Sequence, residues 1–179
     1  MSEKVTIKAE RRELHLPAIA LRGLVVFPNN LVHFEVGREK SIAAVEWAMA
    51  NNSNVFLVAQ KEMELSDPTQ EDLFAYGVVA EVKQVLRVSG DLVKVLVEGK
   101  YRAKLSALDA SGDFLLSEVR PAPVRAGKAD DAVETEALLR ALKAGFDEYL
   151  GMNPRLGKDV VFAIVSSDDP AFLSEYMPA

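Results

Sequence analysis

The sequence predicts an α+β fold, in which a β-rich module with one helix is followed by a segment of helices. Two runs, at 78–88 and 92–97, have mostly apolar residues at every second position, which is typical of strands with one buried face. Beyond residue 121 the alternation gives way to apolar residues at helical spacing, from Leu138 to Leu150. The chain therefore divides into a β-rich part and a helical part.

The join between the two parts is marked by Pro121, Pro123 and Gly127. Proline fixes φ and glycine loosens the chain, so this segment is predicted to be a hinge. The expected boundaries are an N-terminal tail at 1–13, the β-rich part at 14–120, the hinge at 121–129 and the helical part at 130–179.

Short apolar runs separated by turn residues predict the first strands, at 15–21, 25–27, 32–36 and 54–60. The turn signal Pro-Asn-Asn at 28–30 separates the second run from the third. Ile42, Val45 and Met49 recur at helical spacing and predict a helix over 38–50. Asp67-Pro68 indicates an exposed loop over 66–71.

The second half of the β-rich part predicts two hairpins. In the strand at 78–88 the even-numbered residues are expected to face the core: Val78, Ala80, Val82, Gln84, Leu86 and Val88. A turn at 89–91 leads to a strand at 92–97 that buries Val93, Val95 and Val97. Gly99 is expected to end that strand. Strands at 101–108 and 114–120, joined by a turn at 111–113, complete an antiparallel meander.

Three helices are expected in the helical part, at 130–150, 155–165 and 171–176. The first carries an apolar stripe made of Leu138, Leu139, Leu142, Phe146, Tyr149 and Leu150. Asp130 and Asp131 favour its N-terminus, and Gly151 is the candidate C-cap. Asp169 followed by Pro170 predicts the start of the last helix.

The composition describes an ordinary globular chain of 179 residues, with 49% hydrophobic and 27% charged residues. The formal net charge of −6 repels phosphate, which argues against nucleic acid and anionic membranes as partners. No cysteine is present, no apolar stretch approaches the length of a membrane span, and the N-terminus lacks the apolar core of a signal peptide. We expect a cytoplasmic protein.

No arrangement of residues indicates catalysis, a cofactor or a metal. His15 and His33 lie in separate segments without an acidic partner at helical spacing. The segment 151–158 has two glycines and a lysine, but its spacing departs from a phosphate-binding loop and Asp159 replaces the expected hydroxyl residue. We expect no catalytic, cofactor-binding or metal-binding residue in this chain.

One segment suggests a binding surface. The turn in 27–34 carries apolar residues that an exposed patch for protein binding would need. The candidate residues are Pro28, Leu31 and His33, with Phe34 behind them. The alternative is that Leu31 and Phe34 fill the core.

Several segments resemble the N-terminal domain of the Lon family of ATP-dependent proteases. They are LPAIALR (16–22), VVFP (25–28), VGREKSI (36–42), LVAQK (57–61) and VKVLVEG (93–99), with Arg102-Ala103 after them. Their order and spacing match over residues 14–120, and the combination of the third, fourth and fifth is specific. Ala18 and Ala20 stand where the family pattern has larger residues or proline.

The resemblance implies a pseudo-barrel of β-strands followed by a helical bundle. In the family this domain captures unfolded, damaged or regulatory protein substrates and helps to organise a homohexameric ring. The family's full chain continues into an ATPase module, which binds ATP and magnesium, and a protease module with a serine and a lysine. This sequence contains neither, so we expect a non-enzymatic fragment of a longer serine protease.

Three other functions stay open at this stage. A free-standing adaptor would have this domain without a protease, and whether the reading frame continues past Ala179 would decide it. An RNA-binding module is a further alternative, against which the acidic charge argues. A stand-alone hydrolase is the weakest alternative.

Overall fold

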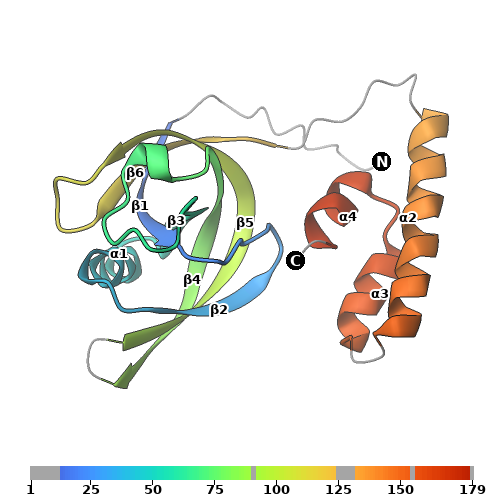
Figure 1. Cartoon of the computed structure of the whole chain (residues 1–179), viewed down its shortest axis with the longest axis horizontal. Coiled ribbons are helices and arrows are strands. Elements are labelled where there is room, and N and C mark those ends of the chain that lie inside the picture. Colours follow the sequence, from blue (N-terminus) through green and yellow to red (C-terminus); the bar gives the residue numbers. More distant parts are fainter. Residues whose placement is uncertain (1–12, 90–91, 124–131, 154–155, 178–179) are drawn as a thin grey trace, which may run out of the picture. The chain divides into compact units, whose positions relative to one another are not determined.

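The computed structural model describes residues 13–89, 92–123, 132–153 and 156–177 (Figure 1). The chain separates into two compact units, one ending at Pro123 and the other beginning at Val124. We call them unit 1 and unit 2. None of the helices described is both long and apolar enough to cross a membrane.

The strands described in unit 1 form one mixed sheet (Figure 1). They are β1 (Leu14–Leu21), β2 (Leu31–Val36), β3 (Asn54–Ala59), β4 (Tyr76–Ser89), β5 (Leu92–Asp109) and β6 (Leu115–Pro121). The order is β2-β5-β4-β3-β1-β6, and β5 also pairs with β6, which closes the sheet on itself. Only the β1–β3 pair among these is parallel. The long strand β5 makes closure possible, because its first half pairs with β2 and its second half with β6.

Two apolar clusters fill unit 1. In the first, Val93, Val95 and Val97 of β5 pack in one cluster with residues of helix α1 (Glu39–Ala50), as the alternation predicted. The second centres on Phe56 and contains Ala18 and Ala20 of β1. Both alanines are almost completely buried, so the core accommodates a small side chain at each of these positions.

Two strand predictions in this unit are wrong, and both errors involve one close approach. Residues 25–27 form no strand but part of the loop that joins β1 to β2. Gly99 does not end a strand, since β5 continues through it. A Cβ at Gly99 would lie 2.3 Å from the carbonyl oxygen of Phe27, so the glycine allows the loop to cross the strand closely.

The face prediction for β4 holds only for its first half. Val78, Ala80 and Val82 are buried as expected. An irregularity in pairing between Val82 and Gln84 then shifts the alternation, so that Val85 packs against the first cluster. Gln84, Leu86 and Val88 are exposed, contrary to the prediction.

The segment between β3 and β4 was expected to be an exposed loop over 66–71. Most of it is exposed, but Pro68 is buried and Gln70–Asp72 forms a 3-10 turn, η1. The Asp72 side chain accepts hydrogen bonds from the backbone N–H and hydroxyl of Thr69, at 2.8 and 2.7 Å. These bonds lower the pKa of Asp72 and fix the start of the turn.

Four charged side chains form a network on β4 and β5. Glu81 and Glu98 face each other across the two strands, where like charges are destabilising. Lys83 Nζ lies 2.9 Å from Glu81 and 2.8 Å from Glu98, and Lys100 Nζ lies 2.7 Å from each. Hydrogen bonds from Lys100 and Lys83 lower the pKa of Glu98 to about 2 and also lower that of Glu81. The lysines therefore offset the repulsion between the carboxylates.

This network is expected to make the stability of unit 1 fall below pH 4.5. The folded-state pKa of Glu98, about 2, lies below its ordinary value of 4.5. Its contribution is therefore complete above about pH 4.5 and is lost as the pH falls toward 2. Urea unfolding at about pH 5 and about pH 3, followed by Trp47 fluorescence, measures the loss. Glu98→Gln should reduce this pH dependence, whereas Glu134→Gln in unit 2 should not; equal slopes would contradict the prediction.

Unit 2 contains helices α2 (Ala132–Met152), α3 (Lys158–Ser166) and α4 (Pro170–Tyr176). Their shared core centres on three buried side chains, Phe146, Ile164 and Leu173. The Asp169 cap is confirmed, because its side chain accepts a hydrogen bond of 2.9 Å from the Ala171 N–H.

Two details of unit 2 differ from the sequence predictions. Gly151 lies inside α2 and does not cap it. Within the predicted stripe Leu138, Leu142 and Tyr149 are exposed, while Phe146 is buried. The predicted N-terminal residues Asp130 and Asp131 lie outside the described residues, as do most of the predicted hinge and the hairpin residues Gly90 and Asp91.

Candidate functional site

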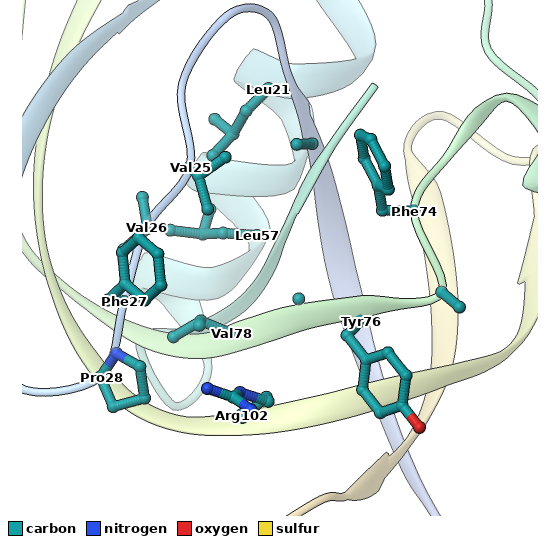
Figure 2. A pocket seen from close by; sticks show the side chains of 13 residues that line it. Leu21, Val25, Val26, Phe27, Pro28, Leu57, Phe74, Tyr76, Val78 and Arg102 are labelled. Carbon is teal, nitrogen blue, oxygen red and sulfur yellow. The ribbon is translucent and has the colours of Figure 1, made fainter. Parts of the chain in front are cut away.

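An apolar hollow of about 520 Å³ opens in the surface of unit 1 (Figure 2). Its walls come from the end of β1 and the loop after it, the end of β3, the segment that leads into β4 together with the start of that strand, and one residue of β5. The lining residues are Leu21, Val25, Val26, Phe27, Pro28, Leu57, Ala59, Phe74, Ala75, Tyr76, Gly77, Val78 and Arg102. A volume of this size is typical of ligand-binding clefts.

Apolar side chains at this hollow remain in contact with solvent. Val25 is 60% exposed, Phe74 51% and Tyr76 54%, whereas Leu57 and Val78 are buried. Figure 2 shows Val25 on the left of the hollow and Phe74 and Tyr76 on the right. Large exposed apolar groups around a buried apolar floor indicate a site where a partner removes the rim from water.

Backbone contacts hold the right-hand wall in place. The Phe74 N–H donates to the Ala59 carbonyl at 3.1 Å, and Gln60 and Leu73 form an isolated β-bridge. At Gly77 a Cβ would lie 2.3 Å from the carbonyl oxygen of Leu57, so only glycine allows β4 to approach β3 this closely. This close approach places Phe74 and Tyr76, which come just before Gly77, at the opening of the hollow.

A cluster of polar side chains fixes the segment before that wall. The guanidinium of Arg38 donates to Gln60 Oε1 at 2.9 Å, to the Ser66 carbonyl at 3.2 Å and to the Ala20 carbonyl. The buried Gln60 in turn donates to the Leu65 carbonyl at 3.1 Å. Burial, and secondly the charge of Arg22, lower the pKa of Arg38. This cluster joins the ends of β1 and β3 to the chain between β3 and β4.

Comparison with known proteins identifies the family. The family model of the ATP-dependent protease La (LON) substrate-binding domain matches residues 15–179. The chain belongs to this family. The resemblance drawn from the sequence is therefore confirmed, and the molecule is a LON substrate-binding domain.

Relatives of this LON substrate-binding domain are Lon proteases. The chain is 37% identical over 160 residues to the Lon protease of Desulforamulus reducens, covering 89% of this chain and 19% of that protein. It is also 37% identical over 171 residues to the Lon protease of Escherichia coli strain K12, covering 95% and 21%. The chain thus spans about a fifth of the length of the curated relatives it matches.

A solved structure shows the same fold. The N-terminal domain of the Mycobacterium avium complex Lon protease aligns with a TM-score of 0.66, at 21% identity, over 90% of this chain and 80% of that one. The mixed sheet and the helices described here therefore match a known Lon N-terminal domain.

The four residues predicted from the sequence lie in three different environments of the LON domain. Pro28 is buried and lines the apolar hollow. Leu31, 63% exposed, and His33 lie on the outer face of β2, and His33 lines a second, smaller hollow of about 180 Å³. Phe34 points the other way and packs against the first apolar cluster. Leu31 does not fill the core, and the binding role of all four stays a prediction.

Sequence reasoning missed Phe74, Tyr76 and Arg102. Phe74 and Tyr76 come just before the predicted strand and continue its alternation at even positions, a pattern that predicts burial, yet both are exposed. Two aromatic residues just before Gly77, outside a predicted strand, could have indicated an exposed apolar surface. Among the described residues no group of histidine and acidic side chains is arranged to hold a metal ion.

Proposed function

We propose that the apolar hollow holds exposed apolar segments of unfolded or damaged proteins for a Lon-type ATP-dependent serine protease. The observation that supports this proposal most is the solvent-exposed rim of Val25, Phe74 and Tyr76 around a buried apolar floor. Such a surface gains free energy when apolar side chains enter it, with little demand on their sequence. Weak, tolerant binding of this kind suits the capture of many different substrates.

The remaining parts of the proposal follow from the family. ATP, magnesium and the catalytic serine and lysine would belong to modules outside this chain, in a cytoplasmic protein. The domain would contribute to a homohexameric ring, and the helices of unit 2 would form the first part of a helical bundle. The boundaries at 14–120 and 130–179 are part of the same proposal.

Aspartate substitutions on the rim test the proposal. Val25→Asp combined with Phe74→Asp should weaken binding of fluorescent, reduced and carboxymethylated α-lactalbumin by at least about tenfold, because apolar burial of two such side chains is worth more than about 1.4 kcal/mol. Both side chains are largely exposed, so the fold should survive, and circular dichroism would verify it.

Two further variants make the test specific. Val88→Asp changes a valine of similar exposure, 54%, that does not line the hollow, and should leave binding unchanged. Leu31→Asp with His33→Asp tests the outer face of β2. If only this second pair weakens binding, the substrate site lies on β2; if neither pair does, this domain does not bind substrates as proposed.

A further inference from the structure

Among the described residues that line the apolar hollow, Arg102 carries the single charge. It lies on β5 opposite Val78 in the strand register, and it is half-buried. Figure 2 shows its side chain beside Val78 and Pro28, away from Phe74. The hollow is therefore asymmetric, because its charge lies at the end near Pro28 and Phe74 lies away from it.

An arginine in such a position favours one class of partner group. A guanidinium has five N–H donors in a planar fork that matches a carboxylate, and charge-assisted hydrogen bonds of this kind are about twice as strong as neutral ones. Apolar walls exclude water, which strengthens the attraction. Arg102 already has an interaction within the domain. Five donors allow a carboxylate to be bound in addition, so that interaction need not be lost.

We propose that the hollow selects apolar segments that carry an aspartate or glutamate side chain next to the apolar anchor, with Arg102 binding the carboxylate. This inference rests on the proposed function and names the substrate class of the same site. A lysine or arginine at the same place in the segment would be repelled. We assign the carboxylate to a side chain within the segment, because a hollow with an exposed rim lets a chain pass across it.

Because the domain has a negative net charge, a preference for acidic segments would point to a local positive charge such as Arg102. At −6, the chain as a whole repels acidic polypeptides. A preference for an acidic neighbour therefore cannot arise from the overall charge and requires a local cation. It should also persist at physiological ionic strength, since contacts at a half-buried group are screened less than surface charges.

The test uses short fluorescent peptides with both ends blocked, identical except for glutamate, glutamine or lysine beside one phenylalanine anchor. A fourth peptide has glutamine at that place and a free C-terminal carboxylate after the anchor. Fluorescence anisotropy with the 179-residue chain should give about five- to tenfold tighter binding of the glutamate peptide than of the glutamine peptide, and the weakest binding for lysine.

Variants at position 102 test whether Arg102 is the residue that binds the carboxylate. Arg102→Gln should remove the difference between the peptides, Arg102→Glu should reverse their order, and Arg102→Lys should keep the order with a smaller difference. Arg87→Gln is the control, because Arg87 is exposed and pairs with Glu46 outside the hollow. Circular dichroism of each variant checks folding. If Arg102→Gln is unfolded, the inference is tested by comparing the affinities of the three peptides for Arg102→Lys and for the native chain.

Failure of this inference differs from failure of the proposed function. If Val25→Asp with Phe74→Asp weakens every peptide but glutamate and lysine bind equally, the inference is wrong and the apolar site remains. If the free C-terminal carboxylate gains affinity and the internal glutamate does not, the assignment to a side chain is wrong. If no peptide depends on the hollow, the proposed function itself fails.

Discussion

Phe56→Ala is expected to destabilise unit 1 by about 3–5 kcal/mol, the cost typical of removing a buried phenylalanine. Phe56 is completely buried in the second apolar cluster. Its register partners are Ala18 on β1 and Val79 on β4, and its ring lies within 3 Å of the position of a Cβ at Gly77. Alanine, glycine and strand backbone cannot expand into the vacated space, so the cavity should remain.

Urea unfolding followed by Trp47 fluorescence measures this loss. Trp47 is a suitable reporter because it lies on α1 and its ring centroid is 5.7 Å from that of Phe114. Phe162→Ala is the matched control, since Phe162 is 74% exposed on α3 and its removal should change stability by less than about 0.5 kcal/mol. A loss below about 1 kcal/mol for Phe56→Ala would show that the second cluster can close around the gap.

The sequence predicted the strands and α1 best where burial has one period. Val93, Val95 and Val97 alternate regularly and are all buried. Ile42, Val45 and Met49 lie on a helix as expected, but only Val45 of the three is buried, and Met49 is exposed. Periodicity carries this information because a strand or helix with one buried face repeats its apolar residues at a fixed interval.

Prediction failed where contacts between distant segments decide the structure. The irregular strand pairing after Val82 exposes Leu86 and Val88 to solvent, and no residue type in β4 predicts this irregularity. Closure of the sheet by β5 and β6 likewise depends on pairing across the whole unit. Gly99 was interpreted as a strand end because a glycine usually weakens a strand, whereas here it makes room for Phe27.

The candidate site was harder to predict than the fold, for the same reason. Pro28, one of the predicted residues, lines the hollow, but the other lining residues Phe74, Tyr76 and Arg102 are more than 40 residues away in the chain. A hollow made from four separate segments has no local pattern. What the sequence could supply was the family resemblance, whose matching segments lie within residues 14–120 and which implied that the domain captures protein substrates.

Gly99→Ala is expected to destabilise unit 1 by about 1–3 kcal/mol, the typical cost of forcing a methyl group into a packed site. The new Cβ would lie 2.3 Å from the Phe27 carbonyl oxygen, 3.1 Å from its carbon and 3.3 Å from Pro28 Cα. The neighbouring atoms are backbone and cannot rotate away. The Gly99 N–H also donates to the Asn30 carbonyl at 2.9 Å, so a displaced loop strains this bond.

The same substitution should weaken substrate binding, because Phe27 and Pro28 form one wall of the apolar hollow. Binding of carboxymethylated α-lactalbumin, measured under conditions in which the variant is still folded, separates this effect from the loss of stability. Gly112→Ala is the control, since its Cβ would meet nothing closer than 3.8 Å and both properties should be unchanged. A variant that lost stability but bound normally would show that the position of the loop does not matter for binding, and that the rim residues Phe74 and Tyr76 carry the site without it.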